Sequence, residues 1–174
     1  MKDYTETVRV EFDPQVISYR RLLDLFWASH DPTYDVSFRQ YRNAVFYTSE
    51  QQRIEAEESR EELKQEKKRP IFSAIESAGT FYPAEDYHQK YYLQKVDGLF
   101  REFRQIYPDN ADFTASTAAS RINGYLGCFG DPQEFKANID LLGLSTKSRN
   151  DLVDYVTTAC KSFEGLTCPA PRRN

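Results

Sequence analysis

A single carboxylate stands in register with an apolar strand face near the start of the sequence. Apolar and polar residues alternate from residue 5 to residue 12. Glu6 shares one face of this predicted strand with Val8, Val10 and Phe12. Burial on that face would favour the protonated carboxyl, and a protonated carboxyl can donate a proton at neutral pH. Glu6 is therefore a candidate general acid; the alternative is a glutamate that frays into solvent at a strand end.

Three cysteines could supply thiol chemistry, and their surroundings differ. Cys128 follows a predicted helix, with a glycine before it and Phe-Gly after it. It is either a recycling thiol or a structural one. Cys168 lies in a Pro- and Arg-rich segment, where an exposed thiol suits disulfide exchange. Cys160 falls beside the apolar stripe of a predicted helix and is expected to be a buried small hydrophobe. The odd count favours a reducing compartment over a disulfide framework.

The remaining catalytic residue types give weaker patterns. His30 and His88 are far apart, and no Cys/His spacing resembles a zinc site, so we expect no bound metal. Glu85 and Tyr91 flank His88 at three-residue steps on a predicted helix, which indicates local hydrogen bonding. No glycine-rich phosphate loop follows a strand.

Charge and hydropathy exclude several classes of partner. The net charge of −4 argues against nucleic acid and against an anionic membrane. No apolar run approaches the roughly 18 residues of a membrane span. Because the residues after Met1 show no signal-peptide pattern, the default location is the cytoplasm.

A small sheet with covering helices is expected to position these residues. After the first strand, Ser18 is predicted to cap a helix that carries Leu23 and Trp27 on its apolar face. Further strands are predicted over 41–47 and 71–76. Between them, a charged surface helix over 50–68 begins with a capping box, Ser49 and Gln52.

Only helices are predicted after Pro83. They cover 84–94, a segment marked by Leu99 and Phe103, and 114–122 with a C-cap at Asn123-Gly124. Two more begin at Asp131-Pro132 and at Ser145. The sequence therefore predicts an α+β fold whose second half is helical.

Four blocks, in order along the chain, resemble the A-type peptide methionine sulfoxide reductases. They are Thr5 to Pro14, Ile17 to Pro32, Gln40-Tyr41-Arg42-Asn43-Ala44, and Phe81-Tyr82-Pro83-Ala84-Glu85-Asp86-Tyr87-His88-Gln89-Lys90-Tyr91. Together they span roughly half of the 174 residues. Asn123 to Gly127 is similar to the longer C-terminal region of animal members.

The resemblance implies a thiol-dependent enzyme that returns the S-epimer of methionine sulfoxide, free or in oxidised proteins, to methionine. A cysteine thiolate attacks the sulfoxide sulfur while an acid protonates the oxygen. The resulting sulfenic acid condenses with a second cysteine, and thioredoxin or another dithiol reduces the disulfide. No metal or organic cofactor is implied. The implied fold is a ferredoxin-like two-layer α/β sandwich over 1–95, followed by a helical extension over 96–174.

The resemblance also implies roles for individual residues. Glu6 matches the general acid, and Tyr41 matches the tyrosine whose hydroxyl binds the sulfoxide oxygen. An ordinary core tyrosine is the alternative for Tyr41. Tyr82 and His88 fall in the block expected to bind substrate. Cys168 and Cys128 are the candidate resolving thiols.

The family's nucleophile motif, Gly-Cys-Phe-Trp-Gly, has no counterpart before Asp3. We therefore expect a sequence that lacks the first β-α-β portion of the family fold and contains no family nucleophile. Gly127-Cys128-Phe129-Gly130 partly echoes the motif, so a nucleophilic Cys128 is one further possibility. Another is a catalytically inactive relative that binds oxidised methionine or a protein partner. A sheet without its first strands is expected to expose an edge and an apolar face.

Overall fold

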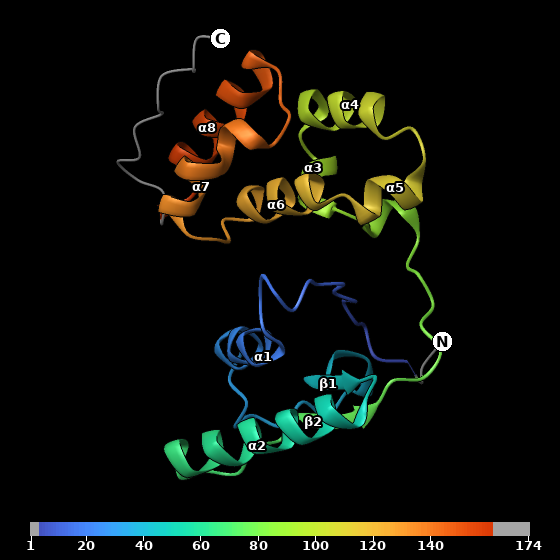
Figure 1. The fold of residues 1–174 in the computed structure, drawn as a ribbon, viewed down its shortest axis with the longest axis vertical. Coiled ribbons are helices and arrows are strands. Elements are labelled where there is room, and N and C mark those ends of the chain that lie inside the picture. The colour runs from blue at the N-terminus through green and yellow to red at the C-terminus, as the bar shows by residue number, and fades with distance from the viewer. Residues whose placement is uncertain (1–3, 162–174) are drawn as a thin grey trace. The chain divides into compact units, whose positions relative to one another are not determined.

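The computed structural model describes residues 4–161 and divides the chain into two compact units, unit 1 (Met1–Tyr82) and unit 2 (Pro83–Asn174) (Figure 1). Unit 1 contains α1 (Tyr19–Ala28), η1 (Arg39–Tyr41), β1 (Ala44–Tyr47), α2 (Glu50–Lys67) and β2 (Ala74–Ser77). Unit 2 contains η2 (Asp86–His88), α3 (Tyr91–Gln94), α4 (Asp97–Ile106), α5 (Asn110–Ala115), α6 (Thr117–Leu126), α7 (Pro132–Asn138), η3 (Ile139–Leu141) and α8 (Thr146–Ala159). The fold is thus a mixture of helices and a small parallel sheet, as the predicted α+β class required.

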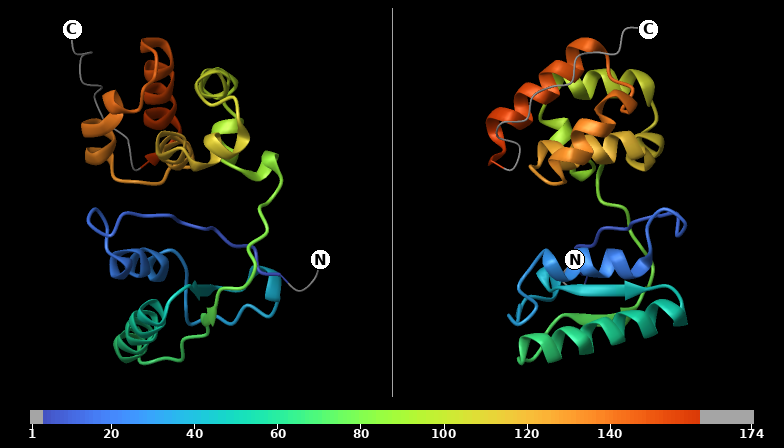
Figure 2. Two further views of the ribbon diagram at one scale, coloured as in Figure 1. Left: turned by 45° about the vertical axis from the view of Figure 1, so that its right-hand side comes forward. Right: turned by 60° about the vertical axis from the view of Figure 1, so that its left-hand side comes forward.

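The sheet of unit 1 is a parallel pair joined by a helix. β1 and β2 pair in register from Ala44 opposite Ala74 to Tyr47 opposite Ser77. Parallel neighbours need a long crossover, which α2 supplies. Figure 2 shows α2 running alongside both strands. Both strands are shorter than predicted: β1 starts three residues late because residues 39–41 form the 3-10 turn η1, and β2 also starts three residues late and ends at Ser77, one residue beyond its predicted range.

The predicted first strand is wrong. Residues 5–12 are in an extended segment without strand pairing, and its apolar face is not buried: Val8 is 85% exposed and Val10 is 56% exposed. The backbone N–H of Glu6 donates to the Gln40 carbonyl at 2.9 Å. A single such bond makes no ladder, and an alternating sequence becomes a strand only where a neighbouring strand pairs with it. The expected burial of Glu6 fails with the strand.

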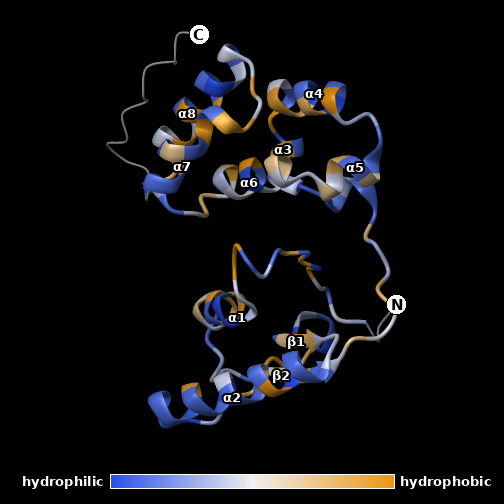
Figure 3. Cartoon of the chain, viewed as in Figure 1, coloured by the Kyte–Doolittle hydropathy of each residue, from blue (hydrophilic) through white to orange (hydrophobic). Residues whose placement is uncertain are grey.

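The predicted caps of both helices of unit 1 are confirmed. The Ser18 hydroxyl accepts from Arg21 N–H at α1, and the Ser49 hydroxyl accepts from Gln52 N–H at α2. The Gln52 side chain reaches the backbone N–H and hydroxyl of Thr48, one residue earlier than a capping box requires. Figure 3 shows α2 as mostly hydrophilic, in agreement with a solvated surface helix.

The core of unit 1 is small. Its buried members are Leu23, Trp27 and Ala56, contributed by α1 and α2, which pack on each other. The Trp27 indole N–H donates to the Ser59 hydroxyl at 3.0 Å, so the one polar atom of this buried ring is satisfied. His30 adds a second link, because its ring contacts the Phe26 carbonyl and the Ser73 hydroxyl.

Unit 2 closes a larger core from its helices. The buried members are Leu93, Leu99, Phe103, Phe113, Ala119, Ile122, Tyr125, Leu126, Phe135, Ile139, Leu142, Leu152, Val153, Val156 and Cys160. Because Leu93 of α3 belongs to this core, the units divide at Tyr82/Pro83 rather than after residue 95. The assignment of a reductase domain with a helical extension stays a prediction.

Two predicted helices of unit 2, over 84–94 and over 114–122, have other boundaries in the structure, and the second begins at Thr117 because residues 114 and 115 belong to α5. The predicted helix over 84–94 is broken into η2 and α3, with Lys90 between them in the left-handed region. The predicted C-cap at Asn123-Gly124 is wrong, because α6 continues to Leu126. The Asn123 side-chain oxygen instead accepts from the backbone N–H groups of Tyr92 and Leu93. Asn123 thus caps the start of α3, a role that only the tertiary contact reveals.

The two remaining caps are confirmed. Asp131 accepts from the N–H groups of Gln133 and Glu134 at α7, and Ser145 accepts from Ser148 N–H at α8. None of the helices in residues 4–161 combines the length and the apolar character that crossing a bilayer requires.

Candidate functional site

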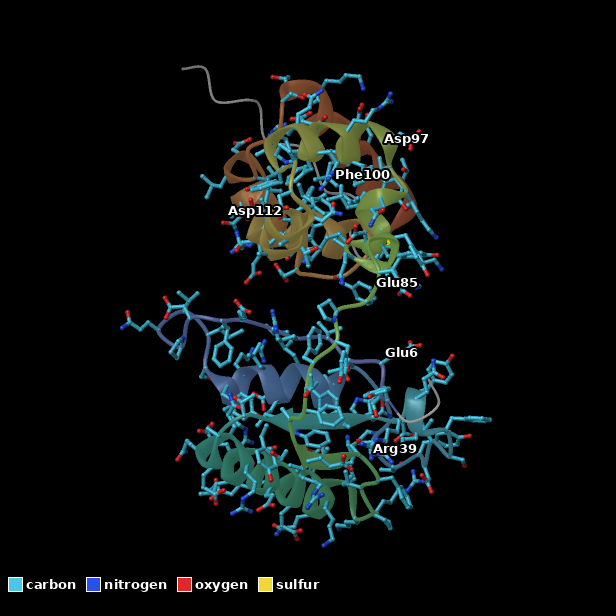
Figure 4. All side chains as sticks on the ribbon, turned by 90° about the vertical axis from the view of Figure 1, so that its right-hand side faces the viewer. Glu6, Arg39, Glu85, Asp97, Phe100 and Asp112 are labelled. Atoms are coloured by element: carbon cyan, nitrogen blue, oxygen red, sulfur yellow. A yellow bond between two sulfur atoms is a disulfide. The ribbon has the colours of Figure 1, made fainter. Side chains whose placement is uncertain are left out.

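Glu6 is held against the chain that leads into β1. Besides the backbone bond to Gln40, the Glu6 carboxylate accepts from the Gln40 side-chain amide at 2.8 Å. The carboxylate is exposed rather than buried, so the desolvation expected from the strand pattern is not observed. Figure 4 labels Glu6 on the extended segment and Arg39 at the start of η1. The structure therefore fixes where Glu6 lies through a specific amide partner.

Tyr41 is the last residue of η1 and directly follows Gln40. Its backbone N–H donates to the Phe38 carbonyl at 3.0 Å, which closes the 3-10 turn. The residue is 60% exposed, so the alternative of an ordinary core tyrosine is wrong. Since Glu6 pairs with Gln40, the structure brings the two predicted site residues onto neighbouring segments of one unit.

An ion pair that sequence reasoning missed lies beside them. Both outer nitrogens of Arg42, two residues before β1, donate to the two carboxylate oxygens of Glu76 in β2, each at 2.6 Å. The Arg42 guanidinium holds the pKa of the Glu76 carboxyl below its usual range. Arg42 Nε also donates to the Thr5 hydroxyl, and that hydroxyl donates to the Arg39 carbonyl. Arg42 thus ties the segment carrying Glu6 to the sheet.

Tyr82 packs on the same extended segment. Its ring meets Tyr4 edge to face at 5.4 Å, and the neighbouring Phe81 ring lies under the Arg9 guanidinium at 4.9 Å. Tyr82 is more than half exposed, so an apolar surface remains open beside it. Unit 1 thereby gathers three of the predicted positions, Glu6, Tyr41 and Tyr82.

His88 belongs to unit 2, at the end of η2. Its Nε2 lies 3.8 Å from a Glu85 carboxylate oxygen, and its ring stacks at a tilt on Tyr87 with centroids 4.2 Å apart. Because 3.8 Å is too long for a hydrogen bond, the expected local hydrogen bonding between His88 and Glu85 is not observed. Tyr91 instead faces Tyr92 and the Lys95 ammonium.

Cys128 and Cys160 form a disulfide, with their Cα atoms 5.2 Å apart and 32 residues of separation. Cys160 is buried as expected, but it is a cystine half rather than a free small hydrophobe, and this bond answers a question that the odd cysteine count left open. Helix packing brings the end of α6 against the end of α8, which the sequence could not reveal. Cys168 lies outside the described residues. In the described part, no group of three His, Cys, Asp or Glu residues is arranged to hold a metal ion.

Comparison with known proteins agrees with the resemblance of the motifs. The family model for peptide methionine sulfoxide reductase matches residues 1–120. The chain belongs to the peptide methionine sulfoxide reductase family. This family match contains Glu6, Tyr41, Tyr82 and His88, and it ends before the three cysteines.

Individual relatives from this family match the chain over different lengths. A peptide methionine sulfoxide reductase of Drosophila melanogaster is 38% identical over 171 residues, which is 97% of this chain and 67% of the fly protein. Reductases named MsrA from Methanosarcina mazei and Methanoculleus marisnigri are 43% and 45% identical over 112 and 106 residues. Those alignments cover 59% and 56% of this chain, and 53% and 64% of the archaeal proteins. The chain therefore spans between about half and two thirds of the relatives it matches.

Proposed function

We propose that this chain serves in the thiol-dependent reduction of the S-epimer of methionine sulfoxide in oxidised proteins. The observation that carries the proposal is the family match over residues 1–120, which contains every residue to which the motifs assign a role before the cysteines. The β1-α2-β2 unit would form part of the family's ferredoxin-like two-layer sandwich. A cytoplasmic location is the matching expectation.

The proposed chemistry divides the work between a thiolate and two oxygen-directed groups. A thiolate attacks the sulfoxide sulfur, the Glu6 carboxyl gives its proton to the oxygen, and the Tyr41 hydroxyl donates a hydrogen bond to that oxygen. The products are methionine and a cysteine sulfenic acid, which condenses with a second thiol and releases water. The amide of Gln40, hydrogen-bonded to the Glu6 carboxylate, supports this assignment because it holds the acid in one position.

Oxidised proteins and free methionine sulfoxide are the proposed substrates, with thioredoxin or another dithiol as reductant. No bound metal or organic cofactor enters this chemistry. Cys128 and Cys168 would act as resolving thiols, and Cys128 could do so only after its disulfide with Cys160 is reduced.

Epimer-selective binding tests the proposal directly. We expect a short peptide with the S-sulfoxide to perturb the amide resonances of residues 4–9 and 38–42, while the R-sulfoxide peptide and the unoxidised peptide perturb them less. Tyr41→Phe should weaken S-sulfoxide binding by about two- to tenfold, the value of one hydrogen bond. Tyr34→Phe is the matched control, since Tyr34 is also exposed and lies outside the motif. Equal binding of both epimers would contradict the proposal.

A second candidate function is an inactive binding protein. The disulfide favours it, because the cysteines of the described part, Cys128 and Cys160, are bonded to each other and neither is a thiolate. A turnover assay with dithiothreitol separates the candidates. S-specific turnover by the 174-residue chain would eliminate the inactive protein. If such turnover is lost in Cys128→Ser but retained in Cys168→Ser, Cys128 is the nucleophile. Selective binding without turnover would establish the binding protein.

A further inference from the structure

The two halves of the disulfide differ in access. Cys128 is an exposed residue in the left-handed region at φ 64°, just after α6. Cys160 is 2% exposed and lies in the core of unit 2, with its sulfur 3.8 Å from the Tyr125 carbonyl. A thiolate from solution therefore reaches the Cys128 sulfur, and the Cys160 sulfur is the leaving group.

A cavity is lined by the two residues that follow the exposed cysteine in the chain, although Cys128 itself does not line it. It has a volume of about 250 Å³ and lies at the turn between α6 and α7. Phe129 and Gly130, the two residues after Cys128, form one wall, and Gly124 and Tyr125 of α6 form another. Phe129 directly follows Cys128 in the chain, so the cavity begins one residue from the exposed cysteine.

The cavity carries one positive and one negative side chain together with flat apolar surface. Arg121 and Glu134 line it, with Asn138 beside them. Both charges act on the Tyr125 phenol, whose pKa is raised first by burial; Arg121 opposes that rise and Glu134 adds to it. No ion pair of Arg121 or Glu134 is formed within the described residues. A ligand with both a carboxylate and an ammonium group matches this arrangement.

We propose that this cavity binds the zwitterionic end of a small peptide thiol, of which glutathione is the simplest probe, and directs its sulfur to Cys128. The thiolate forms a mixed disulfide with Cys128, the bond between Cys128 and Cys160 breaks, and the Cys160 sulfur leaves and takes up a proton. A second thiol then releases Cys128 as a thiol and departs as the small-molecule disulfide. This inference concerns the disulfide alone and does not depend on methionine sulfoxide reduction.

Reduction kinetics of the oxidised chain test the binding step. The Cys168→Ser chain is treated with glutathione or with neutral 2-mercaptoethanol, quenched by alkylation and mapped by mass spectrometry. We expect the rate to saturate with glutathione concentration and to rise linearly with 2-mercaptoethanol. We also expect the mixed disulfide on Cys128. A linear rate with both thiols, or an adduct confined to Cys160, would overturn the proposal.

A matched pair of glycine variants tests the location. A Cβ at Gly124 meets nothing within 4 Å, so Gly124→Leu projects a side chain toward the cavity without backbone strain. Gly98→Leu is the control, since Gly98 is also a helical glycine with open space and lies in α4, away from this cavity. Both changes favour helix formation, which protects the fold. Saturation should disappear in Gly124→Leu and persist in Gly98→Leu; identical kinetics in the two variants would rule out the cavity.

Charge variants test the recognition. Arg121→Gln should raise the half-saturating glutathione concentration by about two- to fivefold, the range of an exposed ion pair, and leave the 2-mercaptoethanol rate unchanged. Arg101→Gln, an exposed arginine of α4, should change neither rate. A loss of rate with both thiols in Arg121→Gln would indicate a structural effect and contradict a binding role.

Discussion

The two units of this chain bury apolar surface to different extents. In unit 2, side chains from most of its helices meet in one continuous core, which includes completely buried residues such as Phe103 and Leu152. In unit 1 the buried cluster is limited to Leu23, Trp27 and Ala56, while several large apolar side chains stay exposed. Both units come from the same chain and carry similar numbers of aromatic residues, 13 in unit 1 and 12 in unit 2.

The difference follows from how each kind of element satisfies its backbone. A helix makes its hydrogen bonds within itself, so packed helices are free to close a core locally. A two-stranded parallel sheet pairs only the inner edges of its strands and is marginal by itself. Unit 1 therefore depends more on polar links such as Trp27 to Ser59 and Arg42 to Glu76. The exposed apolar residues Val8, Val16 and Phe38 lie outside the strands, whereas the apolar residues of β1 and β2 are half-buried rather than exposed as expected for this sheet.

The largest expected effect is in the core of unit 2. Phe103→Ala removes a completely buried ring and should destabilise the unit by about 3–5 kcal/mol, through lost transfer free energy and a residual cavity. Hydrogen exchange of α4, α6 and α8 in urea measures this change. Phe129→Ala, at an exposed ring, should change the free energy of unfolding by less than about 0.5 kcal/mol. Similar effects of the two substitutions would contradict a closed core.

The disulfide should give the next largest effect, and only unit 2 has one, because unit 1 contains no cysteine. Closing a loop across 32 residues is worth about 3–4 kcal/mol in the chain-entropy model. We expect reduced, alkylated protein to lose this amount in the same exchange experiment. The double variant Cys128→Ser with Cys160→Ala should behave like the reduced chain. Unchanged protection after reduction would show that helix packing alone holds α6 and α8 together.

A smaller effect is expected from the polar link of unit 1. Glu76→Gln weakens the paired hydrogen bonds between β2 and Arg42, and since Glu76 is partly exposed the loss should be about 0.5–1 kcal/mol. Fluorescence of Trp27, the single tryptophan, reports the urea midpoint of this unit. Glu62→Gln is the control, because its pairing with Arg20 is more exposed and should contribute less. A larger loss in the control would reverse the assignment.

The smallest expected effect is a pH dependence of stability that differs between the two units. Burial lowers the pKa of His30, although the Phe26 carbonyl and Asp31 oppose this. Because the unfolded chain then binds more protons, the His30 contribution to unit 1 is complete above a pH of about 6.5 and is lost as the pH falls through the folded pKa. The Trp27 midpoint should therefore decline in this window, and His30→Asn should flatten the decline. If the midpoint of His30→Asn declines with pH as in the wild type, other groups cause the decline.

Glu102 is expected to make the stability of unit 2 depend on pH in a lower range. Burial raises its pKa, but hydrogen bonds from Ser148 and Ser145 at the start of α8 outweigh burial, so the net shift is downward. The Glu102 contribution is thus present above a pH of about 4.3 and is lost as the pH falls through its folded value. Hydrogen exchange of α8 between pH 3 and 6 should show this loss in the wild type, and Glu102→Gln should remove it. If Glu102→Gln keeps the same acid loss, these hydrogen bonds do not cause it.

The sequence predicted best those features that depend on neighbouring residues, and it failed for features that depend on distant ones. Ser18, Ser49, Asp131 and Ser145 cap the helices they were expected to cap, because a cap depends on residues within one turn. Asn123 failed as a C-cap, since its side chain is used by α3, thirty residues earlier in the chain. The alternation of residues 5–12 failed for a related reason, as a strand needs a partner.

By itself, the sequence determined the family, the order of the main helices and of the two strands that pair, and the identity of the residues offered for chemistry. Only the tertiary structure decided that Glu6 lies exposed on Gln40, that Arg42 bridges Thr5 and Glu76, and that Cys128 meets Cys160. Motifs and helix caps depend on residues that are neighbours in the sequence. Burial, ion pairs and disulfides depend on which distant segments come into contact. The free energy that favours those contacts is distributed over the whole core, so neither of the two contacting residues reveals it alone.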